Sequence, residues 1–148
     1  MTENISIKEI DRCGMTEALT LVYKVFDEYE APDYTQEGVD EFHKSICAPE
    51  YLSQLYVLGA FDGEKLIGVI AARNQLSHIA LFFVDGEYHR QGIGKALFLR
   101  LLEACPSDII TVNSSPYAVP VYHRLDFCDT NSEQVVKGIR FTPMEFRK

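Results

Sequence analysis

Basic residues are scarce in this chain of 148 residues, which has 14 lysines and arginines against 22 aspartates and glutamates and a formal net charge of −8. A protein that binds nucleic acid or docks on an anionic membrane needs a basic face. The composition therefore argues against nucleic-acid and membrane partners. No apolar run approaches the ~20 residues that span a bilayer, and residues 1–12 lack the apolar core of a signal peptide, so we expect a cytoplasmic protein.

Metal-ligand spacing is also missing. The four cysteines form no CxxC pair, and the four histidines show no paired spacing. We therefore expect no metal site, and we expect reduced cysteines that serve packing. His89 and His123 are expected to be surface or packing residues rather than catalytic ones.

The hydrophobic pattern predicts a single α/β domain over residues 1–148. Hydrophobic residues make up 47 % of the chain, which is enough for one compact core. Alternation and short apolar runs predict strands at residues 5–10, 55–61, 66–73, 79–84, 109–112 and 139–146. Helical spacing and helix breakers predict helices at residues 16–29, 37–46, 93–104 and 119–125. This order indicates a mixed sheet and differs from the regular alternation of a doubly wound nucleotide-binding fold.

A glycine-containing loop joins the predicted strand 79–84 to the predicted helix 93–104. Gly92 and Gly94 allow the backbone to approach a ligand closely. The first helical N–H groups have no partner inside the helix, and together with the helix dipole they favour an anion such as a pyrophosphate. Arg90 and Lys95 add positive charge. The segment therefore predicts a phosphate cradle.

Two other glycine-rich loops fail against these residues. A Rossmann fingerprint would need glycine at position 97, where Leu97 stands. A Walker loop would need glycine at position 89 and serine or threonine at position 96, where His89 and Ala96 stand. A simple strand-to-helix turn is the remaining alternative to a binding loop.

The run from Arg90 to Lys95 (RQGIGK) resembles the (Q/R)xxGx(G/A) acetyl-CoA signature of the GNAT acetyltransferases. Residues 113–127 (NSSPYAVPVYHRLDF) are similar to the second landmark of that family, a short helix with the pattern YxxLGF. The element order matches over nearly the whole chain. The resemblance implies an α+β-type GNAT domain with a mixed, mostly antiparallel central sheet, flanking helices and a parallel strand pair, 79–84 and 109–112, that splays apart.

The resemblance also implies site residues. Acetyl-CoA would be the co-substrate, with its pantetheine arm beside main-chain groups of the strand before the loop and its pyrophosphate on the signature. The cofactor-binding residues implied in this way are Phe82, Phe83, Val84, Arg90, Gln91, Gly92, Ile93, Gly94, Lys95, Asn113 and Ser115. A backbone N–H near Val84 would polarise the thioester carbonyl. Asn113 and Ser115 have helix capping as an alternative role.

Tyr122 matches the tyrosine to which the role of general acid is usually assigned in this family. That residue would donate a proton to the departing thiolate. A tyrosine pKa of ~10 against ~8.5 for a thiol makes full proton transfer uphill by ~2 kcal/mol, so hydrogen-bond donation to the sulfur is the milder role. A core aromatic is the alternative. An amine of pKa ~10.4 is mostly protonated at pH 7. The strand glutamate that some members use as base would fall at Ile110, so the base is left unidentified and a water relay stays open.

Two further positions depart from the family pattern. Asp126 replaces the glycine of LGF, where left-handed backbone is expected. Asp85-Gly86 replaces a common Asp-Pro and is expected to loosen the loop. Neither departure removes a catalytic group.

The expected activity is transfer of an acetyl group from acetyl-CoA to an amine of a small molecule or peptide by direct attack. A non-catalytic acyl-CoA-binding or regulatory domain and a nucleotide-binding module are the alternatives. Seven acidic residues lie between Asp27 and Glu41, and they are either solvated helix faces or a negative lip that attracts a cationic acceptor. The sequence is also compatible with a homodimer.

Overall fold

A mixed sheet organises the computed structural model, which describes residues 4–148. Its strands are β1 (Ile5–Glu9), β2 (Tyr56–Asp62), β3 (Lys65–Arg73), β4 (His78–Val84), β5 (Ile109–Ser114), β6 (Cys128–Asp129), β7 (Gln134–Val136) and β8 (Ile139–Arg147). The order across the sheet is β1-β2-β3-β4-β5-β8-β6, and β7 pairs with β8. Only β4 and β5 are parallel neighbours among these described strands. The predicted mixed, mostly antiparallel sheet is confirmed.

The α-helices are α1 (Met15–Val25), α2 (Gln36–Ile46), α3 (Pro49–Leu52), α4 (Ile93–Ala104) and α5 (Val119–Arg124). The helix predicted at residues 16–29 is wrong at its end, because α1 stops at Val25 and the chain continues as a π-helical turn, Phe26–Glu30. The short helix α3 was not predicted. No helix within residues 4–148 is long and apolar enough to cross a bilayer.

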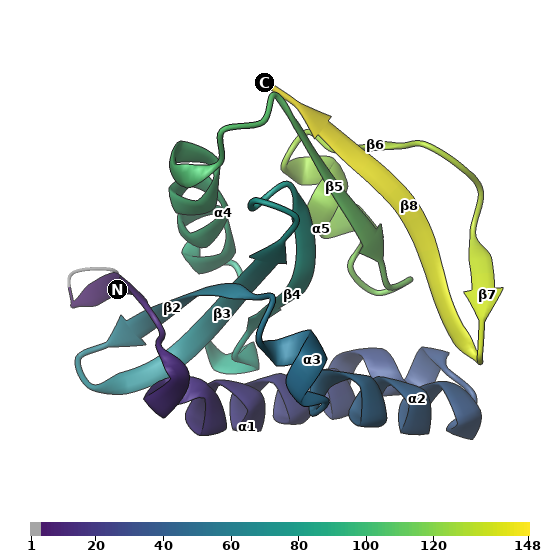
Figure 1. The fold of residues 1–148 in the computed structure, drawn as a ribbon, viewed down its shortest axis with the longest axis horizontal. Helices are drawn as coiled ribbons and strands as arrows, with labels where there is room; N and C mark the ends of the chain where they lie inside the picture. The colour runs from purple at the N-terminus through teal and green to yellow at the C-terminus, as the bar shows by residue number, and fades with distance from the viewer. Residues whose placement is uncertain (1–3) are drawn as a thin grey trace.

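Helices cover both faces of the sheet, with α1 and α2 along one side and α4 on the other (Figure 1). Alternation along the second half of β3 supplies both layers of core, because Val69 and Ala71 pack on the α1 side while Ile70 and Ala72 pack on the α4 side. β3 is an interior strand of the sheet and is buried from residue 66 to residue 72. The sheet is therefore packed on both faces next to β4, the strand that leads into the loop before α4.

The parallel pair β4–β5 separates after a short contact. The two strands pair at His78↔Thr111 and Ile79↔Val112. From there β5 follows β8, with which it pairs from Ile109 to Ser114. Figure 1 shows β5 and β8 leading away from β4. The carboxyl-terminal half of β4 therefore has a free edge, as the predicted splay requires.

Candidate active site

The loop before α4 has the backbone geometry that its glycines predict. Gly92 caps the helix at φ 82°, and Arg90 also has left-handed backbone, at φ 65°. The first hydrogen bond inside the helix runs from the Ala96 N–H to the Gly92 carbonyl, at 3.0 Å. The amides of residues 93–95 precede it and have no helical acceptor. They form a row of donors at the positive end of the helix dipole.

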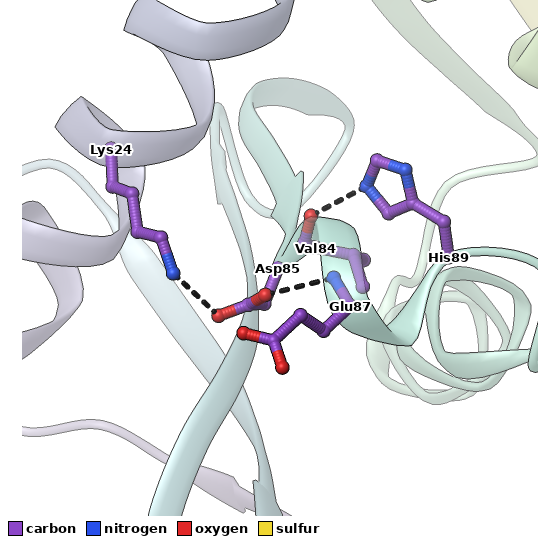
Figure 2. Close-up of polar contacts among 5 residues, drawn as sticks. All are labelled: Lys24, Val84, Asp85, Glu87 and His89. Carbon is purple, nitrogen blue, oxygen red and sulfur yellow. Dashed lines mark hydrogen bonds and ion pairs between the residues drawn. The ribbon is translucent and has the colours of Figure 1, made fainter.

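The free edge of β4 presents the backbone groups of alternate residues. The Asp85 N–H bonds to β3 at 2.8 Å, so in the antiparallel register Asp85 and Phe83 direct their backbone groups toward β3. Phe82 and Val84 therefore direct theirs toward the space that β5 has left. One of these groups is already used, because Nε2 of His89 donates to the Val84 carbonyl at 2.7 Å (Figure 2). The Val84 N–H and both Phe82 backbone groups remain.

Asp85 fixes the start of the loop. Its buried carboxylate accepts hydrogen bonds from Nζ of Lys24 at 3.1 Å and from the Glu87 N–H at 3.0 Å (Figure 2). Burial alone would raise the pKa of Asp85, but these hydrogen bonds outweigh it and hold the pKa below its usual value. At Gly86 a Cβ would collide with the Tyr29 ring. Instead of a loosened loop, the structure shows one tied to α1 and packed against Tyr29.

Two cavities border the free edge of β4. The loop cavity, of about 510 Å³, is bounded by β4, the glycine loop and α5. The hairpin cavity, of about 440 Å³, is bounded by β4, the end of β5, α2 and the β7–β8 hairpin. Both volumes lie in the range of ~300–1,000 Å³ that small-molecule sites occupy. Five residues line both cavities: Glu30, Phe82, Phe83, Ala118 and Tyr122. The two cavities are therefore adjacent, and these side chains form a shared wall.

Tyr122 reaches this junction from α5. Its side chain is buried and packs against Phe82 and Phe127, with ring centroids 5.8 Å and 5.2 Å away. Burial, with a smaller contribution from the negative charge of Glu30, raises the pKa of Tyr122 far above its usual value. The hydroxyl therefore stays protonated at every physiological pH and is suited to donating a hydrogen bond.

Glu30 reaches the junction from the last residue of the π-helical turn. It is only 9 % exposed, and no ion pair within residues 4–148 includes it. Burial raises the pKa of its carboxyl to about 7, although the neighbouring Ser115 hydroxyl stabilises the carboxylate and offsets part of the rise. The negative charge of Asp33 adds to the rise. Glu30 is thus a buried carboxyl that titrates near neutral pH and borders both cavities.

The sequence model of the acetyltransferase (GNAT) domain family matches residues 30–148. The chain belongs to the GNAT family. The protein is therefore an enzyme of the acetyl-CoA-dependent N-acetyltransferase class. A search of curated proteins gave no match.

Solved structures show the same GNAT fold. The chain is similar to a GCN5-related N-acetyltransferase from Rhodopseudomonas palustris (16 % identity, TM-score 0.79, 99 % of this chain and 97 % of that chain covered). It is also similar to the PaiA N-acetyltransferase from Thermoplasma acidophilum in complex with coenzyme A (18 % identity, TM-score 0.78, 97 % of this chain and 99 % of that chain covered). The third similar structure is a putative N-acetyltransferase from Lactobacillus plantarum (13 % identity, TM-score 0.74, 98 % of this chain and 99 % of that chain covered). At these identities the likeness shows the fold.

Most residues that the GNAT resemblance singled out come together in the loop cavity. They are Phe82, Phe83, Val84, Arg90, Gly92, Ile93, Gly94, Lys95 and Tyr122. Gln91 lies outside both cavities, where its Nε2 donates to the Glu87 carbonyl at 3.2 Å. Asn113 and Ser115 line the hairpin cavity instead, because β5 has already diverged from β4 where they occur. Ser115 also caps the next turn, accepting from the Ala118 N–H at 3.2 Å.

Sequence reasoning missed Glu30 as a site residue of this GNAT domain. It grouped Glu30 with six neighbouring acids, although most of these lie on exposed faces. The available signal was spacing, because Val22, Phe26 and Glu30 follow one another at i, i+4 and the first two are fully buried. A carboxylate that continues an apolar stripe is unusual and points to a special role for that side chain.

Proposed function

We propose that the protein transfers an acetyl group from acetyl-CoA, held in the loop cavity, directly to an amine of a small molecule or peptide held in the hairpin cavity. The observation that carries this proposal is the junction of the two cavities, with Tyr122 and Phe82 in the wall of both. Holding two reactants at one junction is the main requirement for a transfer without a covalent enzyme intermediate.

The loop cavity fits the donor. The unpaired amides of residues 93–95, the helix dipole and the exposed side chains of Arg90 and Lys95 suit a pyrophosphate. Gly94 keeps the floor open, since a Cβ there would stand 3.5 Å from the Phe82 ring. We assign the pantetheine arm to the backbone of Phe82 and the N–H of Val84, which face the free edge of β4.

Tyr122 acts on the leaving group by hydrogen bonding. Because its pKa is raised, transfer of the tyrosine proton to a thiolate of pKa ~8.5 is steeply uphill. A hydrogen bond from the hydroxyl still stabilises the charge that develops on sulfur as the carbon–sulfur bond breaks. The backbone N–H of Val84 is the candidate donor to the thioester oxygen.

The positions of the cysteines also favour direct attack of the amine on acetyl-CoA. All four cysteines lie within the described residues and none lines either cavity. Three of them, Cys13, Cys47 and Cys128, are exposed, and the fourth, Cys105, is buried in the core beside α4. The thiol that most readily forms an acyl-enzyme is therefore missing from the site.

The hairpin cavity suits an amine on an apolar body. Its aromatic walls come from Tyr34, Phe42, Tyr51, Phe82, Phe83 and Phe141. Its charged lining residues are Glu30, Glu41 and the exposed Lys137. A cationic amino group and an apolar remainder would match these two kinds of wall.

The test is release of free coenzyme A thiol from acetyl-CoA with a panel of aliphatic, aromatic and peptide amines. We expect thiol release that depends on the amine and an N-acetylated product visible by mass spectrometry. Tight acetyl-CoA binding without turnover on any amine would favour the non-catalytic alternative. Equal thermal stabilisation by ATP or a dinucleotide would contradict the cradle assignment.

A further inference from the structure

We infer that Glu30 is the catalytic base of this enzyme, binding the amino group of the acceptor and removing a proton from it at the junction of the two cavities. This inference rests on the proposed function. It assigns the role of base to Glu30 because the strand glutamate that some family members use is replaced in this chain. Ile110, where the sequence placed that glutamate, is fully buried in the apolar core.

The geometry of the π-helical turn places Glu30 at the junction. Phe26–Glu30 extends α1 by a wider turn, and π-helical turns are frequent at functional sites. Phe26 stays in the core, stacked on Phe42 with ring centroids 3.9 Å apart, and so fixes the turn. Glu30 then lines both the loop cavity and the hairpin cavity.

The surroundings of Glu30 leave its charge for a ligand. Its electrostatic neighbours are Asp33 and Tyr34 from the following turn and Tyr122 from α5, and none of these carries positive charge. Ser115 supplies a hydroxyl from the end of β5. Arg140 of β8 is engaged elsewhere, with Glu133 at 3.1 Å and with the Asp33 carbonyl at 3.0 Å. Lys137 of the β7–β8 turn also lines the hairpin cavity, but it is exposed and forms no ion pair with Glu30. A cationic amine would therefore supply the counter-charge.

The chemistry balances with Glu30 as base. Its carboxylate takes one proton from the ammonium group, which frees the nitrogen lone pair. The nitrogen bonds to the thioester carbon, and the carbon–sulfur bond breaks with its electron pair on sulfur. The nitrogen then loses a second proton, and this proton passes to the sulfur, beside the Tyr122 hydroxyl. Glu30 returns its proton to solvent. A base with a pKa near the working pH is the most effective for such a transfer.

The test compares wild type with Glu30→Gln, which keeps the shape of the side chain and removes the proton acceptor. We expect kcat/KM for the acceptor to fall about 10²–10⁴-fold, the usual contribution of a general base, while the Kd of acetyl-CoA stays within about twofold. Glu28→Gln is the matched control, because Glu28 lies on the same π-helical turn and is exposed. It should keep the wild-type pH profile.

The pH profile separates catalysis from structure. In wild type, kcat/KM should rise about tenfold per pH unit below pH 7 and level off above it, because carboxylate and ammonium react together. In Glu30→Gln only the neutral amine reacts, so the rate should keep climbing toward the pKa of the amine. An acceptor that is already neutral at pH 7, such as an aniline, should shrink the difference between the two enzymes.

Three results would overturn the assignment. One is a Glu30→Gln enzyme within threefold of wild type and with the same pH profile. Another is a loss of acetyl-CoA affinity as large as the loss of turnover. The third concerns the pH dependence of kcat/KM in wild type, which also decides the question if Glu30→Gln does not fold. If kcat/KM shows no inflection near pH 7 with either of two amines of different pKa, Glu30 is not the base. If wild type itself releases no thiol with any amine, the proposed function fails rather than the assignment of Glu30.

Discussion

Nε2 of His89 donates a 2.7 Å hydrogen bond to the Val84 carbonyl, which ties the glycine loop back onto the free edge of β4 (Figure 2). This bond occupies one of the backbone groups that face the space left by β5. It also holds the loop that presents Arg90 and Gly92. His89 thus lines the loop cavity and is hydrogen-bonded to the backbone of the candidate site.

We predict that His89→Ala weakens acetyl-CoA binding, since the loop then loses its anchor to Val84. A hydrogen bond of this kind contributes ~0.5–1.5 kcal/mol, so the Kd should rise by about 2- to 12-fold. Isothermal titration calorimetry measures it. His123→Ala is the control, because His123 pairs with Asp129 at an exposed site, at 2.7 Å. An unchanged Kd in His89→Ala would show that the loop is held without this bond.

The two glycines of the signature should fail in different ways when substituted. Gly94→Val should remove the thermal shift caused by acetyl-CoA while the protein stays folded, because a Cβ at Gly94 makes only ordinary contact with Phe82, at 3.5 Å. In wild type, ligand at 100 times its Kd should add ~2.7 kcal/mol of stability. Gly92→Ala should destabilise the unliganded protein by about 1–2 kcal/mol, because Gly92 has φ 82°. Thermal melts with and without acetyl-CoA read out both, and a full shift in Gly94→Val would contradict the cradle.

Local signals were enough to predict the glycine loop. The strand, the loop and α4 are consecutive in the chain, and Gly92 adopts the left-handed backbone that glycine allows. Asp126, which stands in for a glycine of the second landmark, is also left-handed, at φ 73°. The Phe127 N–H then bonds back to the Tyr122 carbonyl at 3.0 Å and closes α5. These features depend on a few neighbouring residues.

Features set by distant contacts were beyond the sequence. The position of Asn113 and Ser115 is set by strand pairing, because β5 diverges from β4 and pairs with β8. That pairing depends on residues 139–147, which are distant in the sequence. The end of α1 depends on Phe26 stacking on Phe42 across two helices. Spacing puts Glu30 on the buried stripe of its helix, but its raised pKa arises from burial by several elements, which spacing does not reveal.

Tyr122→Phe should lower turnover with little change in acetyl-CoA affinity. The aromatic packing on Phe82 and Phe127 is kept, and only the hydroxyl that we propose to stabilise the leaving sulfur is lost. A loss of about 10²–10³-fold in kcat is the range for one transition-state hydrogen-bond donor. Because the pKa of Tyr122 is raised, wild type should show no basic limb from this residue. Steady-state thiol release measures both, and turnover within twofold of wild type would exclude an essential hydroxyl.

The acidic segment should act on the acceptor through one accessible residue of the hairpin cavity. Glu41 lines that cavity, whereas Glu28 and Asp33 do not. We expect Glu41→Gln to lower kcat/KM for a cationic acceptor more than Glu28→Gln/Asp33→Asn does. The difference should shrink as ionic strength rises, because screening acts over ~8–10 Å at physiological salt. Equal effects of the two variants at low salt, measured with the same amine, would point to a diffuse field instead.

Burial of Glu30 should cost stability at neutral and higher pH. Its carboxyl has a pKa of about 7 in the folded protein against 4.5 for the ordinary group, so the folded state binds more protons between these values. Stability therefore falls as pH rises from about 4.5 to 7, and the full cost persists above pH 7. The shift corresponds to about 3 kcal/mol.

Glu30→Gln should remove this cost. Denaturant unfolding at pH 5 and pH 8 should show the variant gaining stability relative to wild type as pH rises, by up to about 3 kcal/mol between the two conditions. Comparing the two proteins at each pH cancels the titration of every group that they share. A variant that is more stable yet slower would show that Glu30 is kept for chemistry. A variant that becomes relatively less stable as pH rises would instead show that the carboxylate is held by stabilising contacts in the folded protein.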